Sequence, residues 1–144
     1  MIGAAFIFGG GNMERAVFRF IEHELFSYER TKKEIQELRE DIISDSSAPR
    51  DSIPSAGHIS DTTARKAIKL MTNTALTRMT RTVTAIDRAM CRLNENHRAL
   101  FELRYKQALP WHEVCAIIPV SERTYFRMRQ ELVAAVGREM GLEN

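Results

Sequence analysis

The chain has 144 residues, 44% of them hydrophobic and 28% charged, with a formal net charge of +2 at pH 7. That length allows one modest core, or a small domain with an extended helical arm, and excludes a large multidomain protein. The charge is divided unevenly along the chain. Residues 13–60 carry seven basic and ten acidic side chains, residues 61–93 carry seven and two, and residues 94–144 carry seven of each.

The N-terminal part begins with an apolar, glycine-containing run, residues 1–12, which is too short to span a bilayer and has no basic flank typical of an export signal. We expect residues 1–12 to be a disordered tail or the product of a misplaced start codon ahead of Met13. Residues 13–43 contain no Pro or Gly. Their apolar side chains recur at steps of three, four and seven, which predicts an N-terminal amphipathic helix: Val17, Ile21, Leu25, Tyr28, Ile35, Leu38 and Ile42.

Residues 44–60 form a predicted flexible linker, because they contain two prolines, a glycine and six serines without any apolar period. A long basic helix follows over residues 61–93. Its apolar seam has heptad spacing, with Ala67, Ile68 and Met71 extending the seam upstream: Leu76, Met79, Val83, Ile86, Met90 and Leu93. Two pairings stay open, either with the first helix of the same chain in an antiparallel pair or with a second chain in a coiled-coil homodimer.

Three shorter helices are predicted in residues 94–144. The first spans residues 95–107, is capped by Asn94, and turns Leu100 and Leu103 inward. The second begins at Pro110, a residue that suits a first turn, and turns Val114 and Ile117 inward.

The third short helix is predicted to begin at Ser121, because Pro119 ends the preceding helix and a serine hydroxyl caps free backbone N–H groups. One face of this helix belongs to the core and carries Tyr125, Met128, Leu132 and Val136. The order of short helix, tight turn and capped helix is typical of a helix-turn-helix unit. The predicted fold class is therefore all-α, with long antiparallel or coiled-coil-like helices followed by a C-terminal three-helix module.

The other face of the third helix has the chemistry of a DNA recognition helix. Arg can bond two guanine acceptors, Gln can pair with adenine, Glu can accept from cytosine, and Phe can contact a thymine methyl. Arg129 on this helix and Arg104 on the first short helix are expected to lie toward the sides of the recognition face, where phosphate contact is more plausible. The predicted DNA-binding residues are Ser121, Glu122, Arg123, Thr124, Phe126, Arg127, Arg129 and Gln130.

Residues 93–105, 109–114 and 120–129 together resemble region 4 of sigma factors. A wider part, from about Tyr28 to Leu142, is similar to the RinA/ArpU family of phage late-gene transcriptional regulators, through residues 28–43, 63–70, 85–88 and 121–127. The resemblance implies a small activator, encoded by a phage or prophage, that binds a promoter and switches on packaging and structural genes. Pro119 and the balanced charge of residues 94–144 depart from that pattern.

No catalytic, metal or cofactor site is predicted. His97 and His112 lack further ligands at suitable spacing, and the glycines at 9–11 are not followed by the Lys-Ser/Thr of a phosphate loop. Cys91 and Cys115 are expected to be reduced and buried. We therefore predict a non-enzyme without cofactors.

The sequence favours a transcriptional regulator that binds double-stranded promoter or operator DNA in the cytoplasm of a bacterial host cell, with no membrane partner. Two alternatives stay open, a DNA-binding packaging component similar to a small terminase subunit and a sigma-like module that binds RNA polymerase without reading DNA. A homodimer through the long helices is compatible with each of them.

Overall fold

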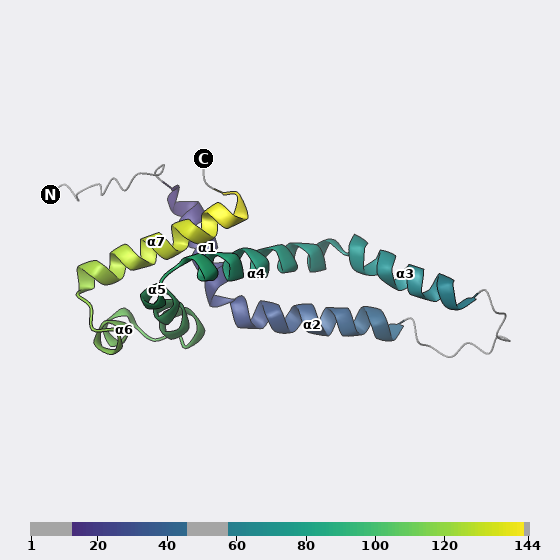
Figure 1. Ribbon diagram of the computed structural model, residues 1–144, viewed down its shortest axis with the longest axis horizontal. Helices are drawn as coiled ribbons and strands as arrows, with labels where there is room; N and C mark the ends of the chain where they lie inside the picture. Colours follow the sequence, from purple (N-terminus) through teal and green to yellow (C-terminus); the bar gives the residue numbers. More distant parts are fainter. Residues whose placement is uncertain (1–12, 46–57, 143–144) are drawn as a thin grey trace. The chain divides into compact units, whose positions relative to one another are not determined.

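The computed structural model describes residues 13–45 and 58–142, and within these ranges the protein is helical without strands (Figure 1). The expected tail of residues 1–12 and most of the expected linker, residues 46–57, lie outside the described residues. None of the described helices is long and apolar enough to cross a membrane. The elements are α1 (Arg15–Phe26), α2 (Tyr28–Asp45), α3 (His58–Thr72), α4 (Thr74–Arg92), α5 (Glu95–Leu100), the π-helix η1 (Phe101–Lys106), α6 (Trp111–Ile117) and α7 (Glu122–Met140).

The chain divides into two compact units. Of the described residues, unit 1 comprises residues 13–26 and 85–142, and unit 2 comprises residues 27–45 and 58–84. Helix α4 contributes residues 74–84 to unit 2 and residues 85–92 to unit 1.

Unit 1 is organised around α7, which packs against α1, α5 and α6, while η1 contacts α1, α5 and α6 (Figure 1). Burial of apolar side chains supplies the main driving force for this arrangement. Arg92 on α4 adds an ion pair to Glu139 on α7 at 2.7 Å. The largest fully buried side chains of the unit are Ile21, Leu25, Ile86, Leu100, Tyr105, Val114, Tyr125, Leu132, Val133 and Val136.

Unit 2 is a thinner assembly of α2, α3 and the first half of α4. Helix α2 packs on α3, and side chains of α2 and α4 line a shared hollow. Among the described residues of this unit, the buried apolar side chains are Tyr28, Ile35 and Leu76. These few side chains supply less hydrophobic stabilisation than the described core of unit 1.

Both long helices expected from the sequence are interrupted. The helix expected over residues 13–43 breaks at Ser27, where Arg30 donates to the Ser27 hydroxyl at 3.1 Å and the Ser27 carbonyl accepts from the Thr31 N–H. The helix expected over residues 61–93 breaks at Asn73, whose side-chain oxygen accepts from the Leu76 N–H at 2.9 Å. In each case a short polar side chain bonds locally at the interruption, as capping residues do.

The predicted seam of the second long helix is buried unevenly. Leu76 and Ile86 are buried, whereas Met79, Val83, Met90 and Leu93 are half-buried. The upstream extension is exposed, with Ile68 at 58% and Met71 at 80% of their full accessibility. The heptad spacing therefore continues onto apolar side chains that are exposed in the described part of the chain.

Two further expectations on burial are wrong. Ile117 is 57% exposed and Ile118 is buried in its place, because α6 ends at Ile117 and the extended backbone of Ile118 turns its side chain toward the core. Cys91 is exposed and Cys115 half-buried, so neither is a core residue. Pro110 immediately precedes α6, with an extended backbone, and Trp111 is the first helical residue.

Candidate nucleic-acid interface

The connection between α6 and α7 is short and held by local hydrogen bonds. After α6 ends at Ile117, Ser121 caps α7: its hydroxyl oxygen accepts from the Thr124 N–H at 3.2 Å and the hydroxyl donates to the Thr124 side chain at 3.0 Å. The predicted cap is confirmed. Because the cap fixes the first turn of α7, the side chains that follow it have a defined direction.

One face of α7 is buried as the sequence predicts. Tyr125 and Met128 are 1% and 4% exposed, and Leu132 and Val136 are fully buried. These residues recur at steps of three and four, so they lie in one stripe against the rest of unit 1. The stripe fixes the rotation of α7 about its own axis and so determines which residues face outward.

The outward face at the start of α7 is polar. Ser121, Glu122, Arg123, Arg127 and Gln130 are exposed, and Thr124 is half-buried beside the cap. Arg127 lies 3.7 Å from Glu131 one turn along the helix, an exposed pair that costs little to separate. This face is the candidate nucleic-acid interface. Five of the eight predicted DNA-binding residues are exposed on it.

Phe126 lies at the edge of the interface and is half-buried. Its ring centroid is 5.1 Å from that of Tyr125 and 6.0 Å from that of Trp111, the first residue of α6. Such offset and edge contacts stabilise aromatic pairs. Phe126 therefore connects α6 to α7, and Trp111, 39% exposed, covers the end of that contact.

Arg129, which the sequence suggests as a phosphate contact, is instead bound within unit 1. Its guanidinium donates to both carboxylate oxygens of Glu22 on α1, at 2.6 and 2.7 Å, and stacks over the Phe18 ring at 5.1 Å. The Tyr105 hydroxyl donates to the same carboxylate at 2.8 Å. Glu22, Tyr105 and Arg129 thus join α1, η1 and α7, and we call them the Glu22 triad.

The electrostatics of the Glu22 triad favour its charged form. Burial by itself raises the pKa of the Glu22 carboxyl, but hydrogen bonds from Arg129 and Tyr105, with the charges of Arg129 and Arg104, outweigh burial and lower the pKa below its usual value. Burial and the Glu22 charge raise the pKa of Tyr105, and the hydrogen bond to Glu22 raises that of Arg129. Glu22 and Arg129 are therefore a charged pair at neutral pH.

Arg104, the second suggested phosphate contact, is half-buried and also engaged within unit 1. It donates to the Leu109 carbonyl at 3.0 Å and stacks over the Phe26 ring at 5.2 Å. The hydrogen bond holds the loop that follows η1 in place. Neither Arg104 nor Arg129 therefore extends freely from the surface.

His97 has a role that the sequence analysis missed. The side chain is buried, with Nε2 2.8 Å from the Glu131 carboxylate on α7 and Nδ1 2.7 Å from the Asn94 side chain. Its position one turn before Leu100, on the apolar face of α5, was the available indication of burial. The Glu22–Arg129 pair had no such indication, because the two residues are 107 positions apart.

The described residues contain no cluster of three or more His, Cys, Asp or Glu side chains that could hold a metal ion. Burial raises the pKa of the Cys115 thiol, and the charge of Glu122 adds to this effect. A raised pKa keeps a thiol protonated and weakly nucleophilic.

Comparison with known proteins gives a single assignment. No curated protein matches the chain, and no solved structure matches it either. One family model matches residues 21–138. This span includes the second half of α1, all elements from α2 to α6, and α7 except its last two residues. Over that span the chain belongs to the family described as "Protein of unknown function (DUF722)".

Proposed function

We propose that the protein is a sequence-specific regulator of transcription that binds double-stranded DNA through the start of α7. The observation that carries the proposal is the division of α7 into a fully buried apolar face and an exposed polar face. A helix that reads DNA needs both faces, because the apolar face must anchor the helix in its domain while the polar face reaches the base edges.

The local geometry of α6 and α7 supports a helix-turn-helix arrangement. Helix α7 is 19 residues long, and the short α6 packs against it after a turn of a few residues. In a helix-turn-helix the second helix enters the major groove with its N-terminal residues nearest the bases, while the first helix crosses the backbone. Ser121 and Glu122 would then lie at the leading end of the recognition helix.

The exposed side chains divide by chemistry. Arg123 and Arg127 suit bidentate bonds to guanine, Gln130 suits adenine, and Glu122 suits the amino group of cytosine. Phe126 and Arg129 are held by contacts within unit 1, so we assign them to positioning of the helix. Base readout in this proposal rests on the exposed residues.

Electrostatics set a limit on the affinity of one copy. Residues 94–144 carry seven basic and seven acidic side chains, and nonspecific affinity for DNA comes chiefly from neutralised phosphates. A single module should therefore bind loosely. Regulators whose single modules bind loosely gain affinity when two linked copies bind two half-sites of the DNA together.

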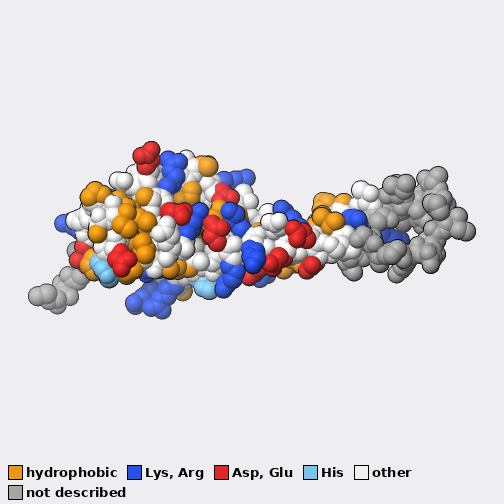
Figure 2. Space-filling view, turned by 90° about the horizontal axis from the view of Figure 1, so that it is seen from below, with side chains coloured by type: hydrophobic (Ala, Val, Ile, Leu, Met, Phe, Trp, Pro, Cys, Tyr) orange, Lys and Arg blue, Asp and Glu red, His pale blue; other side chains and the backbone are white. Residues whose placement is uncertain are grey.

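The proposed role in the cell follows the resemblance to the RinA/ArpU regulators, namely activation of phage or prophage late genes in the bacterial cytoplasm. A second candidate is a sigma-like module that binds RNA polymerase. The observation that favours it is apolar exposure on α6, where Ile117 is 57% and Trp111 39% exposed. Figure 2 shows hydrophobic side chains gathered at the end of unit 1. Exposed apolar patches mark protein contacts more often than DNA contacts.

The test is selection of duplexes from a random pool by the purified protein, followed by fluorescence anisotropy with the enriched duplex. We expect Arg123→Ala and Arg127→Ala each to weaken specific binding by about 1–3 kcal/mol and to relax the preferred sequence. Arg19→Ala, which removes an exposed arginine from α1, is the matched control and should bind as the parent does.

Two outcomes would contradict base readout. Equal losses on enriched and random duplexes would assign the arginines to phosphate contact. The second outcome is that no duplex is enriched, that the immobilised protein retains purified RNA polymerase, and that Ile117→Lys abolishes this retention. The sigma-like module that binds RNA polymerase then replaces the DNA-binding regulator as the proposed function.

A further inference from the structure

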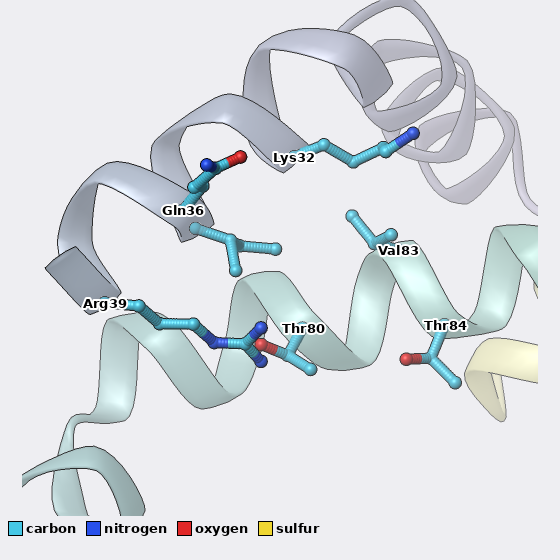
Figure 3. A pocket seen from close by; sticks show the side chains of 7 residues that line it. Lys32, Gln36, Arg39, Thr80, Val83 and Thr84 are labelled. Carbon is cyan, nitrogen blue, oxygen red and sulfur yellow. The ribbon is translucent and has the colours of Figure 1, made fainter.

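Unit 2 carries an open furrow along α2 and α4. Two adjoining hollows of about 340 and 460 Å³ share Arg39 and Thr80 in their linings. Figure 3 shows Lys32, Gln36 and Arg39 on α2 facing Thr80 and Val83 on α4, with the Arg39 guanidinium beside Thr80. The second hollow continues from there to Leu70 and Met71 of α3.

The lining of the furrow combines apolar and cationic side chains. Leu70, Met71 and Leu76 supply apolar surface at one end, and Lys32, Arg39 and Arg81 supply positive charge. Neither hollow has an acidic side chain in its lining. Apolar surface with a cationic rim suits a helix whose exposed face is acidic and partly apolar.

The apolar part of the furrow extends onto exposed surface. Met71 is 80% exposed, and Ile68, one turn earlier on α3, is 58% exposed. Both belong to the upstream end of the heptad seam, whose downstream residues Leu76 and Ile86 are buried. A phosphate backbone does not desolvate such side chains, so the observations favour a protein occupant over nucleic acid.

The chain itself contains a helix face of the matching chemistry. Glu34, Glu37 and Asp41 are exposed and recur on α2 at steps of three and four, so they share one face. Glu34 and Glu37 each pair with a basic side chain of the same helix, Arg30 at 3.6 Å and Lys33 at 3.8 Å, and these exposed pairs cost little to separate. The α3–α4 segment from residue 63 to 84 carries five basic side chains and no acidic one. Each copy thus presents a cationic furrow and an acidic helix face, the two halves of a self-complementary contact.

We propose that unit 2 is a homodimer interface in which the acidic face of α2 from each copy lies in the furrow of the other. Each contact then occurs twice about a twofold axis, which closes the assembly at two chains. Exposed Ile68 and Met71 become the apolar centre of the contact, and the charges set its register. This inference goes beyond the proposed function and does not depend on it.

The first test measures mass in solution by light scattering across a range of protein concentrations. The parent chain is expected to reach twice its mass of 16.5 kDa. Ile68→Lys and Met71→Lys should shift the protein to the monomer, because each variant puts an ammonium group that must lose its hydration into the apolar centre of the contact. Ile117→Lys, a substitution of the same residue type at equal exposure in unit 1, should leave the dimer intact.

The second test exchanges the charges. Arg39→Glu with Arg81→Glu makes the furrow side acidic, and Glu37→Lys with Asp41→Lys makes the α2 face basic. Each double variant alone should be monomeric, since both of its contacts would pair like charges. An equimolar mixture should recover a heterodimer, because both contacts in the mixed pair join opposite charges.

Circular dichroism shows whether each variant keeps its helices, and recovery in the mixture shows directly that both double variants are folded. A parent chain that stays monomeric at every concentration overturns the proposal. So does a dimer that survives Ile68→Lys and Met71→Lys, or a mixture in which both folded double variants remain monomeric. A ring of more than two chains would also overturn the twofold arrangement.

Discussion

At the scale of single residues, the Glu22 triad shows how unit 1 is held together. A carboxylate that accepts two bonds from one guanidinium and a third from a phenol has its hydrogen-bonding capacity largely used. The Glu22 side chain is only 15% exposed, so removing its charge leaves Arg129 partly buried without its partner. Loss of one partner of a buried pair costs more than the pair contributes to stability.

We expect Glu22→Gln to lower the free energy of unfolding by about 2 kcal/mol at pH 7, since hydrogen bonds to charged groups are the stronger ones. The pKa of Glu22 is lower in the folded protein than its ordinary value of 4.5. Its contribution to stability is therefore present above that value and is lost as the pH falls through the folded-state pKa. Urea unfolding of the parent and variant at pH 7 and in acid measures the difference.

The matched control for Glu22→Gln is Glu24→Gln on the same helix. Glu24 is half-buried on α1 and is not part of the Glu22 triad, so the Glu24→Gln variant should keep a stability, and a pH dependence of stability, close to the parent's. If the difference in free energy of unfolding between Glu22→Gln and the parent is the same in acid as at pH 7, the charge of Glu22 is not what stabilises unit 1.

At the scale of elements, the ends of helices are set by identifiable residues. Ser121 and Asn94 cap their helices with side-chain oxygens, and Gly141 ends α7 with a φ of 73°, a conformation that glycine adopts readily. The loop after η1 differs, because Ala108 occupies the same left-handed region with a φ of 56°. An L-residue there costs about 1–2 kcal/mol relative to the right-handed region.

We expect Ala108→Gly to raise the free energy of unfolding by about 0.5–1 kcal/mol, because relief of the left-handed backbone exceeds the extra entropy of glycine in the unfolded chain. Ala116→Gly, at an exposed position inside α6, should instead lower it by about 1 kcal/mol. Thermal unfolding followed by circular dichroism measures both. Equal destabilisation by the two variants would contradict strain at Ala108.

At the scale of the whole molecule, the division into two units predicts two responses to core substitutions. Leu76 is buried in unit 2 and Ile86 is buried in unit 1, although both lie on α4. The sole tryptophan, Trp111, belongs to unit 1 and reports on its unfolding. Far-ultraviolet circular dichroism reports on the helices of both units.

We expect Leu76→Asp to destabilise unit 2 by roughly 2–4 kcal/mol, because a carboxylate that must lose its hydration replaces an apolar side chain that is only 4% exposed. The part of the dichroism melt that reports on unit 2 should then move to lower temperature, while the midpoint of the Trp111 fluorescence transition should stay unchanged. Ile86→Asp should move the fluorescence transition, and Val83→Asp, at a half-buried position, should have the smallest effect. Equal shifts of both probes in Leu76→Asp would show that the units unfold together.

The faces of α7 and the positions of its cap were predictable from the sequence because both depend on local rules. A step of three to four residues places Tyr125, Met128, Leu132 and Val136 on one side, and a serine after a proline-containing turn favours a helix start. The break at Asn73 was also within reach, since asparagine is a strong cap. The break at Ser27 was not, because it lies in a run with regular apolar spacing.

The spacing of apolar residues was enough to predict the all-helical class of the described residues, the buried stripe of α7 and its polar face. Which charged side chains of α7 remain exposed depends instead on how the helices pack together. Arg123, Arg127 and Arg129 are the same residue type on one helix, yet Arg129 is bound to Glu22, which lies 107 positions earlier in the chain. Periodicity describes one helix about its own axis, whereas the partner of Arg129 depends on how α1 packs against α7.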